Sequence, residues 1–205
     1  MMGWYGFLFD RTFRAENLVR YSVTLKALRE DLHGQKVAII GNARALAQGT
    51  AGDRIDANDL VIRINRAPMP NPVSHGSKTN WLALSTSLSR AQADLINPDR
   101  ILWMSHKRKR LPFWVASRPG FYLYPLTDFR TLSSRLGAPP STGAMIIDLV
   151  VSAMARSIEL YGFDFFASLS LTGSRTAAQV PHDFSAEKTW LAALADQDYR
   201  LKICQ

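Results

Sequence analysis

The chain carries the stretch VAIIGN at residues 37–42 and the stretch DLVIRINRAP at residues 59–68. Each contains an apolar run rich in β-branched residues, which favour strands. The first run ends at Asn42 and the second at Asn65. Buried parallel strands give such unbroken apolar runs, and open α/β sheets bind ligands beyond the carboxyl ends of their strands. The two stretches therefore predict a parallel sheet with two neutral amide side chains at its ligand-binding edge.

Short apolar runs alternate with helical patterns along the rest of the chain, which favours an α/β fold. Besides the strands in the two quoted stretches, we expect strands at residues 81–84, 101–104, 121–124 and 158–163, and helices at 12–32, 42–48, 88–96, 145–156 and 183–195. This alternation predicts a mostly parallel, Rossmann-like sheet with helices on both faces. A length of 205 residues suits one domain, residues 1–205, with residues 1–34 as an N-terminal helical extension.

The composition is that of a globular protein with a positive charge. Hydrophobic residues make up 47% of the chain, charged residues 20%, and the formal net charge is +8. Such a charge attracts nucleotides, nucleic acid or an acidic membrane surface without choosing among them. The apolar opening at residues 1–9 is far shorter than the roughly 20 residues of a spanning helix, so only peripheral contact with a bilayer stays open. Cys204 is the only cysteine, which excludes an intrachain disulfide.

The pair Gly41–Asn42 lies between an expected strand and an expected helix. Glycine lets a ligand approach the backbone closely, and the N-terminus of a helix favours a phosphate. An ordinary strand-to-helix turn also uses these residues. The dinucleotide-binding fingerprint is excluded because its second and third glycines are missing.

Arg63 and Asn65 alternate with isoleucines, so we expect both side chains on one face of a strand. A buried polar group without a partner costs roughly 1–3 kcal/mol. A nucleotide would satisfy the two side chains, and so would structural carboxylates such as Asp56 or Asp59.

Two further blocks carry polar groups that suit a binding site. The stretch PPSTG at residues 139–143 places Ser141, Thr142 and Gly143 before a helix, where hydroxyls and free N–H groups either cap the helix or bind an anion. His182 precedes the last expected helix, with Glu187 five residues later. A neutral imidazole can take a proton from a hydroxyl near neutral pH, although a histidine at a helix start need have no chemistry.

Together these four blocks resemble the large, small and very small motifs of the sialyltransferase family, glycosyltransferase family 29. Its members are inverting enzymes that use CMP-sialic acid and need no metal. The resemblance implies a GT-A-like variant of the expected fold and a donor site in which Asn42 and Asn65, with Gly41, contact the nucleotide. It implies that Ser141, Thr142 and Gly143 hold the CMP part or the sugar carboxylate. In the same way His182 becomes the catalytic base, with Arg63 and Glu187 in supporting roles.

The chain departs from the family pattern at three places. Val37 occupies the position where animal members carry a disulfide-forming cysteine, which predicts a cytoplasmic, bacterial-type relative. In the run HGSKT, residues 75–79, Lys78 replaces the usual arginine and keeps the charge without the forked geometry. The segment at residues 164–171 lacks the histidine of a further aromatic motif, so the sequence leaves open whether that loss abolishes activity.

The expected function is transfer of sialic acid from CMP-sialic acid to a glycan hydroxyl. Another CMP-activated acidic sugar, such as Kdo, has the same leaving group, and a non-catalytic nucleotide- or anion-binding module is a second alternative. We expect no cofactor and no metal, cytoplasmic localisation with possible peripheral contact at an anionic inner membrane surface, and no nucleic-acid partner. The donor sugar, acceptor, linkage and oligomeric state stay open.

Two other patterns are less informative. Asp196 and Asp198 have the spacing of a metal-binding Asp-x-Asp motif, but they follow an expected helix, and we interpret them as solvated surface. The run KRKR at residues 107–110 is typical of an exposed loop, although nucleic acid, anionic lipid or an acidic saccharide would also suit it.

Overall fold

The computed structural model describes residues 3–164 and 181–204, which form an α/β fold with one sheet. The sheet has seven strands in the order β5-β4-β3-β2-β1-β6-β7, and every neighbouring pair is parallel. The expected parallel sheet is therefore confirmed. Its strands are β1 (Lys36–Ile40), β2 (Leu60–Ile64), β3 (Trp81–Leu84), β4 (Arg100–Trp103), β5 (Tyr122–Leu123), β6 (Ser157–Tyr161) and β7 (Leu201–Cys204).

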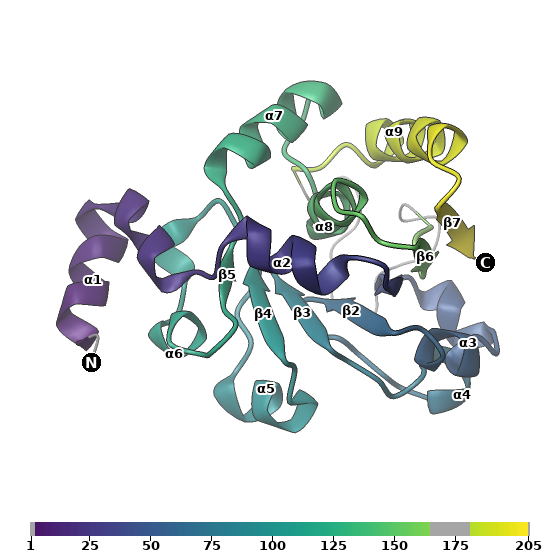
Figure 1. Cartoon of the computed structure of the whole chain (residues 1–205), viewed down its shortest axis with the longest axis horizontal. Coiled ribbons are helices and arrows are strands. Elements are labelled where there is room, and N and C mark those ends of the chain that lie inside the picture. Colours follow the sequence, from purple (N-terminus) through teal and green to yellow (C-terminus); the bar gives the residue numbers. More distant parts are fainter. Residues whose placement is uncertain (1–2, 165–180, 205) are drawn as a thin grey trace.

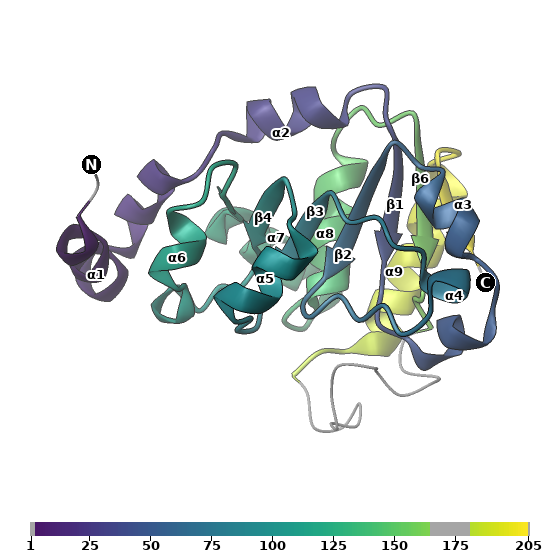
Figure 2. The ribbon, with the colours of Figure 1, turned by 90° about the horizontal axis from the view of Figure 1, so that it is seen from below.

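Helices cover both faces of this sheet, as Figures 1 and 2 show. The N-terminal helices are α1 (Trp4–Phe13), η1 (Ala15–Tyr21) and α2 (Leu25–Leu32). One face carries α7 (Leu126–Leu136), α8 (Thr142–Val151) and α9 (Phe184–Gln197). The other carries α3 (Gly52–Asp56), α4 (Pro72–His75), α5 (Arg90–Ile96) and α6 (Phe113–Ala116). Two short 3-10 helices, η2 (Arg44–Gln48) and η3 (Arg108–Arg110), complete the elements.

Side chains of each central strand alternate between the two covered faces. In β1, Val37 and Ile39 pack in the cluster that includes α8 and α9, whereas Ala38 and Ile40 pack in the cluster that includes Ile55 of α3. Both faces therefore exclude water, which explains why the first stretch is apolar without interruption.

The order of the strands fixes where a ligand can bind. The chain moves outward from β1 to β5 and then returns to place β6 on the opposite side of β1. In open α/β sheets a crevice opens beyond the carboxyl ends of the strands at such a reversal. The N-terminus of α8 lies at this edge, because a Cβ atom added to Gly143 would stand 2.8 Å from the ring of Phe163, just after β6.

Several expected elements differ in the structure. The helix expected at residues 12–32 is divided among α1, η1 and α2, and the segment 42–48 contains a 3-10 helix in place of an α-helix. The last expected helix does not close the fold, because β7 follows it and pairs with β6. The sequence patterns also missed α7. Within the described part of the chain, no helix is both long and apolar enough to cross a membrane.

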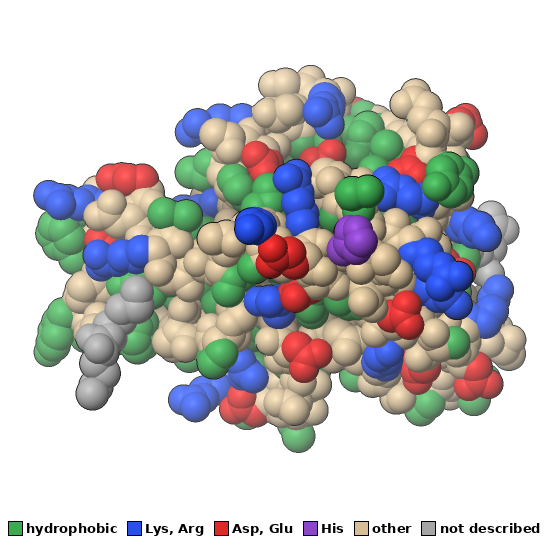
Figure 3. Space-filling model, in the orientation of Figure 1, with side chains coloured by type: hydrophobic (Ala, Val, Ile, Leu, Met, Phe, Trp, Pro, Cys, Tyr) green, Lys and Arg blue, Asp and Glu red, His purple; other side chains and the backbone are tan. Residues whose placement is uncertain are grey.

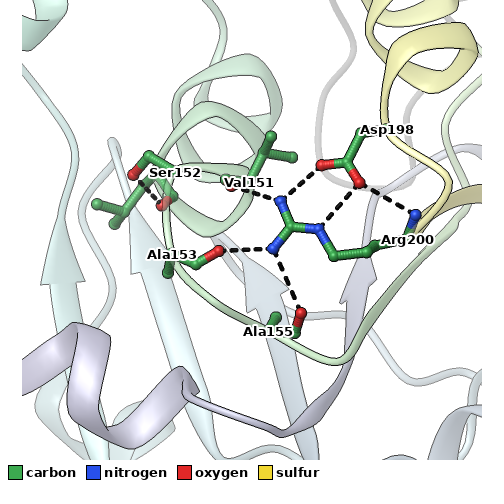
Figure 4. Close-up of polar contacts among 7 residues, drawn as sticks. Val151, Ser152, Ala153, Ala155, Asp198 and Arg200 are labelled. Atoms are coloured by element: carbon green, nitrogen blue, oxygen red, sulfur yellow. Dashed lines mark hydrogen bonds and ion pairs between the residues drawn. The ribbon is translucent and has the colours of Figure 1, made fainter.

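Arg200 fastens the end of α8 to the strand at the edge of the sheet (Figure 4). Its guanidinium donates to the carbonyl oxygens of Val151, Ala153 and Ala155 at distances of 2.9–3.3 Å. Asp198 pairs with the same guanidinium at 2.6 Å, and this ion pair lowers the pKa of the carboxyl. The interpretation of Asp198 as solvated surface is therefore wrong: it neutralises a cation that satisfies helix-end carbonyls.

Candidate active site

Gly41, in the first quoted stretch, is required by the close packing of two backbone segments. The Gly41 amide donates to the carbonyl oxygen of Tyr161 at 2.7 Å. A Cβ atom at Gly41 would lie 2.2 Å from the carbonyl oxygen of Gly162, far inside van der Waals contact. The absence of a side chain thus lets the chain leave β1 directly beside the end of β6. This packing accounts for Gly41 whether or not a ligand also approaches.

Both predicted asparagines lie at the carboxyl edge of the sheet. Asn42, half-buried, points its Nδ2 toward the carbonyl oxygen of Ile64 at 3.5 Å, across to the end of β2. Asn65 accepts from the amide of Ser85 at 3.0 Å, across to the end of β3. The predicted position of the two amides is therefore confirmed, and their contact with a nucleotide stays a prediction.

Arg63 lies apart from Asn65, so the expectation that they share one strand face is wrong. The backbone turns at Asn65, whose φ of 54° ends the strand and redirects its side chain. The guanidinium of Arg63 is only 1% exposed and donates to the carbonyl oxygens of His75 and Lys78 at 2.7 and 3.0 Å. Burial lowers the pKa of Arg63 to about 10, and Asp56 opposes that shift. Its partners come from the protein, so Arg63 supports the loop before β3.

The run at residues 75–79 forms the other half of this cluster. The Asp56 carboxylate accepts from the amides of Ser77 and Lys78 at 2.8 and 3.0 Å, and these bonds lower the pKa of Asp56. Lys78 donates through Nζ to the carbonyl oxygens of Asn58 and Asp59 at 2.6 and 3.0 Å. A lysine therefore suits this position, because two backbone carbonyls need no forked donor. We call Asp56, Arg63, His75 and Lys78 the internal clamp.

Ser141 caps the N-terminus of α8 and is held by a buried carboxylate. Its Oγ accepts from the Ala144 amide at 3.1 Å, as a capping serine does. Its own amide and hydroxyl donate to the two carboxylate oxygens of Glu187 at 2.6 and 2.7 Å. Glu187 is 4% exposed, and burial raises its pKa while the bonds from Ser141 oppose that shift. Ser141 therefore caps α8 as expected, and Glu187 holds this capping residue in place.

His182 is bound to the loop just before Ser141. Its Nδ1 lies 2.8 Å from the carbonyl oxygen of Pro139. A carbonyl oxygen only accepts, so Nδ1 carries the hydrogen and the neutral ring keeps its lone pair on Nε2. The ring also packs edge-on against Phe184, with centroids 5.8 Å apart. This arrangement is the one that a general base requires, since the orienting bond fixes the tautomer.

The structure thus gathers most of the predicted residues at one edge. Gly41 and Gly143 both pack on Phe163, and Thr142 is buried beside them in the first turn of α8. Asn42 and Asn65 mark the ends of β1 and β2, and His182 joins α8 through Pro139. Arg63 alone among the predicted residues belongs to the internal clamp. Most of the segment 164–171, where the family motif is missing, lies outside the described residues.

The sequence patterns missed His106, which follows β4 at the same edge. Its ring lies 4.5 Å from that of Phe129 on α7, with the ring planes tilted by 31°. Burial lowers the pKa of His106, and the nearby charges of Lys107, Arg108, Arg110 and His182 lower it further. A histidine just beyond a predicted strand was the signal that could have found it. Arg108 also corrects the expectation of a fully exposed basic loop, because it is buried and donates to the carbonyl oxygen of Ser105 at 2.9 Å.

The residues that the structure describes contain no group of three His, Cys, Asp or Glu side chains placed to hold a metal ion. An open hollow of about 370 Å³ lies between η1 and α6, and its lining includes Arg20, Phe113 and Arg118. None of the predicted site residues lines it. The hollow is therefore separate from the edge that carries His182.

Comparisons with known proteins find a matching family model and similar solved folds. The model of glycosyltransferase family 29 (sialyltransferase) matches residues 13–110, whereas none of the curated proteins compared with the chain matches it. A mammalian sialyltransferase in complex with Gal-beta-1-3GalNAc-ortho-nitrophenol is similar with a TM-score of 0.66 and 18% identity, over 98% of this chain and 84% of that one. A second similar structure is the sialyltransferase CstII from Campylobacter jejuni in complex with cytidine-5'-monophosphate. Its TM-score is 0.57 and its identity 18%, over 83% of this chain and 79% of that one. For CstII in complex with CMP-3FNeuAc the TM-score is 0.54 and the identity 16%, over 82% of this chain and 78% of that one.

The motif resemblance and the family match coincide on the two quoted stretches, and the likeness of fold extends over nearly the whole chain. The recognition made from the motifs is thus confirmed. Residues 13–110 match the model of glycosyltransferase family 29, the sialyltransferases, and the chain has a fold similar to that of solved sialyltransferases.

Proposed function

We propose that this glycosyltransferase moves sialic acid from CMP-sialic acid to a hydroxyl group of a glycan, with inversion and without a metal. The observation that carries the proposal is the contact of His182 with Pro139, which leaves Nε2 as the basic nitrogen beside the N-terminus of α8. Similar proteins support the substrate class: CstII is described with CMP and with CMP-3FNeuAc, and the mammalian sialyltransferase with Gal-beta-1-3GalNAc-ortho-nitrophenol.

The donor nucleotide would lie at the carboxyl edge of the sheet, beyond β1 and β6. Asn42 and Asn65 offer neutral amide groups there, which suit a cytosine and a ribose better than a charged side chain would. Backbone N–H groups of Thr142 and Gly143, in the first turn of α8, suit the phosphate or the sugar carboxylate. The helix dipole adds to their attraction for an anion.

The reaction balances through His182. The acceptor oxygen forms a bond to the anomeric carbon as the bond from that carbon to the phosphate oxygen breaks, and CMP leaves with the electron pair. The hydroxyl proton moves to Nε2 of His182. Negative charge grows on the departing phosphate, where donors fixed in the folded protein stabilise it without reorganising. Glu187 acts indirectly, as a positioning residue. It binds Ser141 and so fixes the loop whose Pro139 carbonyl orients His182.

A transfer assay with two donors tests this function. Purified protein is incubated with CMP-sialic acid or CMP-Kdo and a galactose-terminated oligosaccharide, and CMP release and the mass of the oligosaccharide are measured. We expect a mass increase of one sialic acid residue. An increase with CMP-Kdo alone would replace the donor sugar and leave the mechanism intact.

A non-catalytic nucleotide-binding module is the second candidate, because the sequence lacks one family motif at residues 164–171. Thermal stabilisation by CMP, with neither transfer nor hydrolysis of any CMP-sugar, would favour it. UMP at the same salt concentration is the matched control, since attraction by net charge alone would treat both nucleotides alike. We also propose a cytoplasmic location. Any contact with an anionic membrane would involve a different surface, the one formed by α1.

A further inference from the structure

An unusual number of large aromatic side chains is exposed on α1, at the opposite end of the molecule from α9 (Figures 1 and 2). Tyr5 is 82% exposed, Phe13 73%, Trp4 51% and Phe9 50%. Trp4 packs on Tyr5 and Phe9 packs on Phe13, with ring centroids 5.4 and 5.5 Å apart. Such contiguous apolar surface is rare on a monomeric soluble protein and marks an interaction site. We call these four side chains the aromatic face.

The aromatic face belongs to a helix that is firmly docked. Phe7, on the opposite side of α1, is fully buried and its ring contacts those of Tyr21 and Phe113. Asp10 is buried as well, where it pairs with Arg20 and accepts from Asn17 at 3.2 Å. The inner side of α1 therefore holds the helix in place while its outer side faces solvent. Exposure of the aromatic face is a property of the folded chain and not of a frayed end.

The charge beside this face is predominantly positive. Arg14 lies over the ring of Phe9 at 5.4 Å, and Arg11 donates to the carbonyl oxygen of Leu111 at 3.1 Å. The latter contact brings η3 against α1, with Lys109 and Arg110 in it. Among residues 3–164 and 181–204, Arg14, Lys109 and Arg110 form no ion pair. Glu16 is the one exposed acid within α1 and η1. Figure 3 shows hydrophobic and basic side chains next to one another at this end.

We propose that the aromatic face of α1 docks on a bilayer that contains anionic lipids. Trp, Tyr and Phe rings partition into the boundary between headgroups and acyl chains, and neighbouring Arg and Lys side chains attract the anionic headgroups. A second copy of this chain suits the face less well, because the same unpaired cations would meet across a symmetric interface.

Vesicle flotation of the full chain tests this proposal. Vesicles of phosphatidylcholine with phosphatidylglycerol are compared with vesicles of phosphatidylcholine alone. We expect binding to the anionic vesicles that weakens as salt is raised. The double substitution Phe9→Ser and Phe13→Ser should weaken that binding about tenfold or more, because two rings no longer insert. Circular dichroism checks that the variant is folded.

A matched control separates docking from general hydrophobicity. Leu95 and Tyr199 are 87% and 90% exposed and lie outside α1, so Leu95→Ser with Tyr199→Ser should leave vesicle binding unchanged. Equal losses in the two double variants would overturn the proposal, as would a folded wild-type chain that ignores anionic vesicles. Light scattering that shows a dimer dissolved by Phe9→Ser and Phe13→Ser would overturn it too, because the face would then cover a second copy.

Discussion

Two polar regions arise from the same part of the chain, residues 36–79, and they differ in where their partners come from. In the internal clamp, Arg63 is closed off from water and donates to the carbonyl oxygens of His75 and Lys78, while the half-buried Asp56 accepts from the backbone of residues 77–78. At the sheet edge, Asn42 and Asn65 are half-buried at the carboxyl ends of β1 and β2. The comparison teaches that a polar residue in a functional motif need not touch a ligand. Its own partners decide whether it stabilises the site or takes part in it.

Replacing His182 with Ala should abolish most sugar transfer at the sheet edge and leave the stability provided by the internal clamp unchanged. Loss of a general base costs roughly 10²–10⁴-fold in rate. We expect the rate of sugar transfer to fall by that factor while the affinity for CMP, measured by calorimetry, is unchanged. His33 is exposed and follows α2, so His33→Ala is the matched control. Full transfer by the His182 variant would remove His182 from the mechanism.

Replacing Arg63 with Met should have the opposite profile. The change removes the donors to His75 and Lys78 and leaves Asp56 without its nearby cation, so the free energy of unfolding should fall by about 3–5 kcal/mol. Urea unfolding measures this loss. The exposed neighbour Arg66, changed to Met, should stay within about 0.5 kcal/mol of wild type. If CMP affinity of the folded Arg63 variant collapsed while stability held, Arg63 would belong to the donor site after all.

Alanine variants of Asn42 and Asn65 should differ in stability, by less than the loss expected for Arg63→Met. Asn42→Ala removes an amide that contacts the carbonyl oxygen of Ile64 at 3.5 Å, and we expect CMP affinity to fall about tenfold. Asn65→Ala should also lose about 1 kcal/mol of stability, because it gives up the Ser85 bond and keeps a positive φ. Asn65→Gly, which tolerates that φ, should recover part of the stability and none of the affinity. Identical behaviour of the two Ala variants would contradict this distinction.

The clamp should also respond to acid. Burial and the charge of Arg63 lower the pKa of His75 below its ordinary 6.5. As pH falls past 6.5 the unfolded chain takes up a proton before the folded chain does, so stability is lost. We expect urea unfolding between pH 7.5 and 5.5 to show a steeper loss for wild type than for His75→Gln. The raised pKa of Glu187 has the opposite effect, since it adds stability as pH falls. That contribution is the same in both proteins, so it cancels when their pH profiles are compared. Parallel pH profiles would mean that His75 is protonated equally in the two states.

Much of the fold could be predicted because its signal is local. β1 and β2 lie where the two quoted stretches predict strands, and β3 agrees with the expected strand at residues 81–84 at both ends, since buried strands require apolar runs. α7 and β7 escaped prediction for a physical reason. Helix α7 buries only Leu132 and Leu136 and has a mostly polar sequence, and β7 at the edge of the sheet needs little apolar surface. Both depend on contacts with distant elements.

The residues of the site divide in the same way. The sequence by itself determined the parallel sheet, the two amides at its edge, the capping serine and the motif resemblance, because each depends on neighbours along the chain. Only the tertiary structure decided that Arg63 is held internally, that Glu187 holds Ser141, and that Pro139 orients His182. These contacts join residues that the chain separates by up to 46 positions. Hydrogen bonds at such separations depend on how strands and helices pack, and no local pattern specifies them.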